Sequence, residues 1–321
     1  MSNLERDPAE RVLTELGSSA TILAPRDVPL GGPRSMSVRR TLPQRARSLI
    51  GPWCFVDHYG PDPVDGVGAM NVPPHPHTGL QTVSWLFDGE IEHRDSAGNH
   101  AMVRPGELNL MTAGRGIQHS EVSTSNTTVL HGAQLWVALP DADREHAPFF
   151  EHYAPPAIAW GEATLRVFLG SLAGSVSPAT AFSAIVGAQV ELPAGTSIDL
   201  PVDPSFEHGV LLDRGSIAVD GLDLPLSHLS FQDTGATSIR LEAGPAGARL
   251  LLIGGAPFGE SIVMWWNFIG RSHDEIVAYR AEWQSDVIAG RNGAGPFGSI
   301  DDAAGPLPAP ELPTVRLRPR A

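Results

Sequence analysis

The chain has 321 residues and no lysine, so arginine supplies all 22 of its basic side chains, against 36 acidic ones. The formal net charge is −14. A surface of that sign argues against binding to nucleic-acid phosphates and against docking on anionic membranes, because both attract basic proteins. We therefore expect neither nucleic acid nor membrane as a direct partner. The missing lysine itself points to no mechanism.

Cysteine is almost absent too. Cys54 is the single cysteine, which excludes an intrachain disulfide and leaves nothing that indicates an oxidising compartment. No run of about 18 apolar residues is present, so no membrane-spanning helix is predicted. Residues 1–15 mix charges and lack the apolar core of a signal peptide. These observations predict a cytoplasmic protein.

Glycine and proline are abundant, with 34 and 29 residues respectively. They separate many short apolar or alternating runs between Ser37 and Leu139, and again between Leu165 and Ile253. Such a pattern is typical of strands joined by tight turns, as in a sandwich or jelly roll. The chain is also longer than the roughly 250–300 residues at which single cores stop growing, so two domains are expected. The sequence predicts an all-β protein.

The composition divides the chain into four parts. Residues 1–30 form an N-terminal extension, and residues 31–145 a first β-domain. Residues 146–284 form a second β-domain with a closing helix, and residues 285–321 a Pro/Gly-rich tail expected to be extended or disordered. The segment 140–156, rich in Asp, Pro and His, is interpreted as the connection between the domains.

Two helices are suggested by their start signals. Ser272 to Glu275 is a capping box, and apolar side chains follow it at helical spacing up to Trp283. In the N-terminal extension, Asp7 and Pro8 could begin a short amphipathic helix that reaches Leu16. A partly ordered surface extension is an equally good interpretation of that second segment.

Histidine is concentrated in the first domain, where seven of the 12 histidines lie between His58 and His131. Two short motifs stand out, His75-Pro76-His77 and His119-Ser120-Glu121. Side chains i and i+2 of a strand point to the same face, so two facing strands would bring all four ligand-type side chains together. Three imidazoles and one carboxylate are a transition-metal donor set. We predict a mononuclear metal site with His75, His77, His119 and Glu121 as ligands.

The remaining histidines of this domain fit structural or orienting roles better than ligation; they are His58, His93, His100 and His131. A ligating imidazole usually donates its other ring N–H to a fixed acceptor. Asp57 and Asp95 are candidates for that acceptor, and the sequence does not choose between them.

A weak internal repeat appears when Gly89 is set on Gly215. This alignment puts Pro201 and Asp203 at the positions of the first histidine pair, so the second domain lacks the pair. The nearby ligand-type residues do not fall at ligand positions; they are Glu207, His208 and His228. A metal site is therefore expected in the first domain only.

The donor set limits the metal. A structural zinc site would favour several cysteine ligands, and Cys54 is the single cysteine of the chain. Three imidazoles and one carboxylate leave one or two coordination positions open on Fe(II), Mn(II), Ni(II) or Cu(II), and Zn(II) remains an alternative. An open position can take dioxygen or a chelating substrate. Glu121 could then serve both as a ligand and as the base that accepts a substrate hydroxyl proton.

With these motifs the chain resembles the pirin family of the cupin superfamily, most closely over residues 35–140. The matching residues are Gly51-Pro52, Asp57-His58, His75 to Gly79, Thr82-Val83, Gly89, His93 to Ser96, Gly98-Asn99, Pro105-Gly106, Met111 to Gly116 and His119 to Glu121. The resemblance implies a bicupin, two jelly-roll barrels with metal in the first barrel only. It also implies iron as the usual metal, held by the four residues named above.

Some positions depart from the family pattern. Gln81 or Thr82 stands where cupins in general carry a glutamate, and Asn109 stands where many pirins carry glutamine. The segment 264–271 also differs from the sequence usual near the end of pirins. These departures suggest a subfamily.

The resemblance implies a first function, an Fe(II)-dependent dioxygenase of the quercetin 2,3-dioxygenase type that acts on a flavonol or enediol-like substrate. Candidates to line its apolar pocket are Trp53, Phe55, Trp85 and Met111, for which core packing is the plainer role. The alternative is a non-enzymatic regulator whose iron redox state controls binding of a protein partner. A purely structural bicupin is disfavoured, because the motif from His119 to Glu121 is intact.

Overall fold

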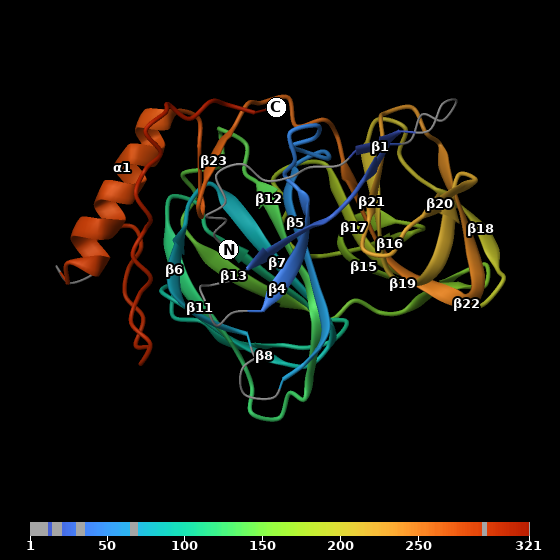
Figure 1. Ribbon diagram of the computed structural model, residues 1–321, viewed down its shortest axis with the longest axis horizontal. Helices are drawn as coiled ribbons and strands as arrows, with labels where there is room; N and C mark the ends of the chain where they lie inside the picture. Colours follow the sequence, from blue (N-terminus) through green and yellow to red (C-terminus); the bar gives the residue numbers. More distant parts are fainter. Residues whose placement is uncertain (1–11, 15–20, 30–35, 65–69, 291–293, 321) are drawn as a thin grey trace.

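The computed structural model describes residues 12–14, 21–29, 36–64, 70–290 and 294–320, in which two β-barrels lie side by side (Figure 1). A short helix, α1, stands at the outer side of the first barrel. The prediction of an all-β protein with a short C-terminal helix is confirmed. Within the described residues, no helix combines the length and the apolar character needed to cross a membrane.

The first barrel is built from two facing sheets. Its strands are β3 (Arg26–Pro29), β4 (Ser37–Leu42), β5 (Trp53–Pro63), β6 (Asn71–His77), β7 (Leu80–Asp88), β8 (Ile91–Asp95), β9 (His100–Val103), β10 (Leu108–Thr112), β11 (Ile117–Ser123), β12 (Val129–Ala138) and β13 (Phe149–Tyr153). A seven-stranded sheet has the order β13-β10-β7-β12-β5-β4-β3, and a four-stranded sheet has the order β6-β11-β8-β9. Both histidine motifs lie in the smaller sheet.

The second barrel is a single sheet of 11 strands. Its strands are β1 (Val12–Thr14), β2 (Thr21–Leu23), β14 (Ile158–Trp160), β15 (Ala163–Leu172), β16 (Ser175–Val176), β17 (Ile185–Leu192), β18 (Ser197–Pro201), β19 (Glu207–Val219), β20 (Leu222–Leu224), β21 (Leu229–Gln232) and β22 (Ser238–Gly255). The long strand β22 pairs with β18 over its first part and with β17 over its second, while β19 pairs with both parts.

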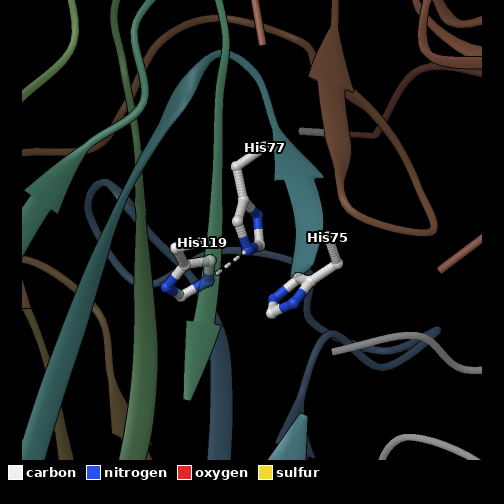
Figure 2. A group of neighbouring side chains, drawn as sticks. All are labelled: His75, His77 and His119. Carbon is white, nitrogen blue, oxygen red and sulfur yellow. Dashed lines mark hydrogen bonds between the residues drawn. The ribbon is translucent and has the colours of Figure 1, made fainter. Parts of the chain in front are cut away.

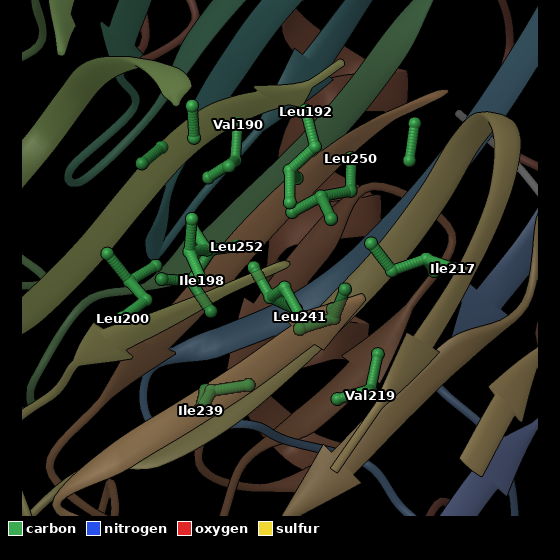
Figure 3. Packing of buried hydrophobic residues seen from close by; sticks show 14 of the residues in the cluster. Val190, Leu192, Ile198, Leu200, Ile217, Val219, Ile239, Leu241, Leu250 and Leu252 are labelled. Carbon is green, nitrogen blue, oxygen red and sulfur yellow. The ribbon is translucent and has the colours of Figure 1, made fainter. Parts of the chain in front are cut away.

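The interior of the second barrel is aliphatic (Figure 3). Inward-facing side chains alternate along each strand, as Ile198 and Leu200 do on β18 and Leu250 and Leu252 on β22. They pack into one buried cluster with Val, Leu and Ile side chains of the neighbouring strands. This barrel therefore has the composition of an ordinary hydrophobic core.

The two barrels share an apolar interface. The outer face of the large first sheet contributes Val83 and Trp85, which join a buried cluster with Phe168 and Leu251 of the second barrel. As a consequence the larger sheet is covered on both faces. Its strand β5 is buried from Trp53 to Gly60 without polar–apolar alternation.

Two of the first described strands, β1 and β2, belong to the second barrel. Strand β2 pairs with β21, and β1 pairs with β2 (Figure 1). The helix expected between Asp7 and Leu16 is therefore wrong at Val12–Thr14, where tertiary pairing overrides the helical pattern. The rest of that helix prediction lies outside the described residues.

The C-terminal part packs against the first barrel. Strands β23 (Val263–Trp265) and β24 (Phe268–Gly270) form a hairpin, followed by α1 (His273–Trp283) and the π-helix η1 (Gln284–Ile288). The predicted helix start is confirmed with Ser272 as N-cap, since Glu275 N donates to Ser272 Oγ at 3.2 Å. The Glu275 carboxylate accepts from the N–H of Arg271, at 2.8 Å, where a full capping box would use the N–H of Ser272. Residues 294–320 are largely extended, and the N–H of Leu307 donates to Pro74 O, beside the first histidine motif, at 2.8 Å.

The segment 140–156 is more than a connection. It contains β13, which pairs with β10 at the edge of the first sheet. The loop prediction is wrong there, because aromatic side chains at Phe149, Phe150 and Tyr153 support a strand inside a stretch whose Asp and Pro content suggested a loop. We propose that the first domain extends to Tyr153.

Candidate metal centre

The register of the small sheet decides which ligand candidates can meet. Strand β11 lies between β6 and β8. His119 pairs with His75 on β6 and with Asp95 on β8. His77 lies two positions along β6, opposite Ile117. Direct cross-strand pairs have Cβ atoms about 4.5–5.5 Å apart, so the His75–His119 pair forms the middle of the site.

The rings of His75, His77 and His119 converge inside the first barrel (Figure 2). Ring nitrogens from the three side chains lie within 4.8 Å of one another. His77 Nε2 is 3.1 Å from His119 Nε2, and the ring centroids of His75 and His119 are 4.4 Å apart. Each of the three side chains is only 1% exposed. The structure thus brings together three of the four predicted ligands.

Glu121 lies at the far end of this group. A β-bulge separates it from His119 in the pairing with β6, and its partner on β8 is His93. Its carboxylate falls within 4.8 Å of ring nitrogens of His93 and His119, and no described group holds Glu121 together with His75 and His77. The antiparallel register explains this, because His77 and Glu121 extend from the central pair in opposite directions.

Burial sets the protonation of the site. Desolvation lowers the pKa of His75 to about 3 and holds the pKa values of His77 and His119 well below the ordinary value. Mutual repulsion of the rings adds to the effect for His77 and His119. All three imidazoles are therefore neutral at pH 7, so each has a lone pair on one ring nitrogen. Desolvation also raises the pKa of Glu121, which Ser84 partly offsets with a hydrogen bond to Oε1 at 3.2 Å.

This donor set fits a divalent transition metal. Two Nε2 atoms that face each other at 3.1 Å cannot both carry a hydrogen. A cation that accepts lone pairs from both nitrogens, and from His75, suits such an arrangement, since neutral imidazole is the form that binds metal. The adjacent carboxylate of Glu121 supplies an anionic oxygen of the kind the same metals accept.

His58 and His131 belong to a second cluster, at the junction of the barrels. Their Nε2 atoms lie 2.8 Å and 2.6 Å from Asp213 Oδ1 on β19. Arg249 Nε donates to the other oxygen of Asp213 at 2.5 Å and Arg39 faces His58 Nδ1 at 3.4 Å, so two guanidinium charges adjoin the group. A divalent cation would be repelled there, and the arrangement is better described as a buried polar contact that joins the barrels.

Of the other residues predicted to orient a ligand, only some lie near the histidine group. Asp57 accepts two hydrogen bonds from Arg40, at 2.6 and 2.7 Å. His100 is half exposed and lies against Glu92. Asp95, by contrast, is 3.2 Å from His93 Nε2, so of the two candidate carboxylates it is the one that reaches the site, through His93.

The four candidates to line a pocket also differ in whether they face the interior of the first barrel. Trp53 and Trp85 point away from the site into the interface, where Trp53 Nε1 donates to Gly254 O at 3.0 Å and Trp85 Nε1 to Gln189 Oε1 at 2.8 Å. Phe55 and Met111 do belong to the interior cluster of the first barrel. Trp53 and Trp85 therefore have the core-packing role that is the plainer expectation from the sequence, and they do not line a pocket at the histidine group.

Sequence reasoning missed three side chains near the ligand candidates. The ring of Trp136 meets His77 edge-on, with centroids 5.1 Å apart, and stacks on Phe55 at 4.1 Å. Ser84 lies within hydrogen-bond distance of both Glu121 and Gln134 Oε1, at 3.2 and 3.0 Å. The available signal was strand alternation, which turns every second side chain of β7 and β12 into the barrel, among them Ser84, Gln134 and Trp136.

The fold and this cluster together define a two-barrel cupin protein with a buried histidine group in its first barrel. Family models agree. The Pirin model matches residues 35–137, and the Pirin C-terminal cupin domain model matches residues 187–289. The chain belongs to the pirin family, which confirms the resemblance inferred from the motifs.

Individual relatives extend the comparison. The chain is 42% identical over 291 residues to a Pseudomonas aeruginosa protein that bears the provisional name quercetin 2,3-dioxygenase, covering 90% of this chain and 89% of the relative. It is 34% identical to a pirin-like protein of Caulobacter vibrioides, covering 78% and 89%. A crystal structure named quercetin 2,3-dioxygenase from Acinetobacter baumannii superposes with a TM-score of 0.86 at 36% identity, covering 94% of this chain and 97% of that one.

Proposed function

We propose that this pirin holds one divalent transition metal, Fe(II), through His75, His77, His119 and Glu121, and that it acts as a dioxygenase of the quercetin 2,3-dioxygenase type. The observation that carries the proposal is the convergence of three buried, neutral imidazoles in the first barrel. The names of the relatives support the reaction class. The substrate would be a flavonol or a similar enediol, with dioxygen as the second reactant.

The metal would supply Lewis acidity toward a chelating substrate and a redox partner for dioxygen. The protein's own contribution centres on Glu121. Ser84 donates to its Oε1 and so helps to hold the carboxylate in place, where it would bind the metal and accept the proton of the substrate's hydroxyl group. Burial makes this carboxylate a stronger base than an exposed one, because desolvation raises the pKa of Glu121.

Water is excluded from the site by close packing. The four proposed ligands are at most 2% exposed, and Trp136 and Phe55 form an aromatic wall beside His77. The β23–β24 hairpin adds cover from outside, since Ile269 N donates to Thr78 O at 3.0 Å. A flavonol would have to displace some of this packing to reach the centre, as lids and loops do in many enzymes.

The test begins with metal analysis of protein purified without chelator. Flavonol is then added to the Fe(II)-loaded protein without oxygen, and a perturbed metal spectrum is expected. On admission of air, wild type should consume substrate and oxygen, and His119→Ala should not. A metal-loaded wild type that turns over no member of a broad flavonol and enediol panel would overturn the dioxygenase proposal while leaving the metal centre intact. The cytoplasmic location stays a prediction.

A further inference from the structure

Beside the three converging imidazoles lies a fourth buried histidine that the proposed metal set does not use. His93 is on β8, directly opposite Glu121, and its side chain is buried. Its Nδ1 lies 3.3 Å from Nδ1 of His119, and its Nε2 lies 3.2 Å from Asp95 Oδ2. The three side chains form one line from the proposed metal position to a carboxylate.

The two nitrogens of the His119 ring face different neighbours. Nε2 points to His77 and Nδ1 points to His93. Ring nitrogens of one imidazole point to opposite sides, so a single ion cannot bind His119 through both. If the ion sits among His75, His77 and His119, then His93 is on the other side of the His119 ring and lies outside the ligand set.

The carboxylate at the end of the line is tightly held. Asp95 Oδ1 accepts hydrogen bonds from the backbone N–H groups of Ala97 and Asn99, at 2.9 and 3.0 Å. Its other oxygen, Oδ2, faces His93 Nε2 at 3.2 Å, and the side-chain amide of Asn99 lies 3.0 Å from both carboxylate oxygens. The His93 ring is held as well, because it stacks on Phe150 with centroids 4.8 Å apart. Neither the carboxylate nor the ring can turn without losing these contacts.

These contacts determine first the tautomer of His93 and then that of His119. An ionised carboxylate only accepts, so His93 must carry its hydrogen on Nε2. The lone pair of neutral His93 is then on Nδ1, and it accepts a hydrogen from His119 Nδ1. His119 in turn has its lone pair on Nε2, the nitrogen that faces His77. The metal-binding tautomer of His119 follows from the position of Asp95.

We propose that Asp95 and His93 are positioning residues that fix His119 in its metal-binding tautomer. The inference rests on the proposed metal centre and extends it. It differs from the common arrangement, in which a carboxylate contacts the ligating histidine directly, because here a second imidazole stands between them.

Asp95→Asn tests the proposal with little change in shape. The two backbone donors keep the side-chain oxygen at the Oδ1 position, so the amide NH₂ must face His93 Nε2. Nε2 then becomes an acceptor, Nδ1 a donor, and His119 is driven to carry its hydrogen on Nε2. Asp57→Asn is the matched control, since Asp57 is a buried carboxylate of the same barrel that pairs with Arg40.

The measurement is titration of the metal-free full chain with Co²⁺, followed by its visible absorption. We expect Asp95→Asn to bind Co²⁺ about 10–100-fold more weakly than wild type, with an altered spectrum, as for other partners of ligating histidines. Asp57→Asn should bind as wild type does. Equal affinity of Asp95→Asn and wild type, or equal weakening in both variants, would overturn the tautomer proposal.

X-ray absorption of the Co²⁺-loaded protein separates the remaining alternatives. His93→Gln should keep the same number of coordinated imidazoles as wild type, and the loss of one would make His93 a ligand and overturn its positioning role. Wild-type protein that binds no Co²⁺ would overturn the metal centre itself. That outcome is distinct from the case in which wild type binds and Asp95→Asn binds equally well.

Discussion

The two β-barrels of this protein have opposite interiors. In the first, β6 directs His75 and His77 inward, and polar side chains such as Ser84 and Glu121 share the interior with apolar ones. In the second, the corresponding strand β18 directs Ile198 and Leu200 into an aliphatic cluster (Figure 3). The barrel architecture accommodates a reactive site in one copy and a plain core in the other.

This difference has an energetic side. A buried polar group that loses its hydrogen-bond partner costs about 1–3 kcal/mol, so an interior with four histidines and a glutamate is less favourable than an aliphatic one. The aliphatic cluster of the second barrel has no such cost, although His208 on β19 is buried with neither ring nitrogen hydrogen-bonded among the described residues. This barrel also contributes a wide apolar surface to the shared interface. We infer that the second barrel supports the first, whose interior is adapted to binding.

The largest expected effect is on metal binding. His77→Ala removes one of three converging imidazoles and should weaken Co²⁺ or Fe²⁺ binding by more than about 100-fold, beyond the effect of losing an outer partner. His228→Ala is the control in the second barrel, where the ring contacts only the carbonyl of Leu226 among the described hydrogen bonds. Metal content by mass spectrometry measures both. Equal occupancy in the two variants would remove the distinction between the barrels.

A second effect concerns the junction. Asp213→Ala leaves His58, His131 and Arg249 without their shared carboxylate and should lower the free energy of unfolding by about 3–5 kcal/mol. Urea denaturation of the metal-free protein measures it. Asp199→Ala breaks a surface pair with Arg240, whose side chains are 63% and 45% exposed, and should change little. If both variants lost the same stability, the junction would have no special role.

The aliphatic core gives a third prediction. Leu252→Ala opens a cavity in the second barrel and should cost about 2–5 kcal/mol of stability. Because the substitution is remote from the histidine group, Co²⁺ affinity of the folded variant should equal that of wild type. A changed affinity would show that the second barrel also tunes the site, and would contradict the simple division into a support and a binding barrel.

The smallest effect is a pH dependence of the metal-free protein. The pKa of His75 is about 3 in the folded chain against an ordinary value of 6.5, so between these values the unfolded chain binds more protons. Stability should therefore fall as the pH drops through this window, by up to about 1.4 kcal/mol per pH unit for each such histidine. Urea midpoints at pH 7 and pH 5.5 should differ less in His75→Gln than in wild type. Parallel curves would exclude this contribution from His75.

Much of the fold and part of the candidate site could be predicted from the sequence, because they depend on short-range patterns along the chain. Strand alternation and turn residues predict an all-β chain, and i,i+2 spacing predicts that His75 and His77 share a face. The position of Glu121 could not be predicted, since it depends on the register between β6 and β11 and on a bulge. Register is decided by tertiary packing, which a single strand's pattern does not contain.

The sequence could not tell which of the four aromatic or apolar pocket candidates line the barrel, for a related reason. Trp53 and Trp85 lie in strands that are buried on both faces, so hydrophobicity does not tell which face lines the barrel. His93 had a readable signal, the alternation of Ile91, His93 and Asp95 along β8. The contact between His93 and His119 could not be predicted from the sequence, because only the fold brings the two side chains together.

The two ends of the chain are exchanged between the barrels. Strand β2 completes the edge of the second barrel at β21, while residues 294–320 run along the first, where Leu307 contacts Pro74. Cutting the chain at the connection after Tyr153 would thus give two fragments that each lack a piece held by the other. A first-barrel fragment would leave the strand of His75 uncovered, and a second-barrel fragment would expose the edge of β21. The segments that complete each barrel in space are therefore not its neighbours in the sequence. We expect the metal site to form in the full chain and not in either fragment.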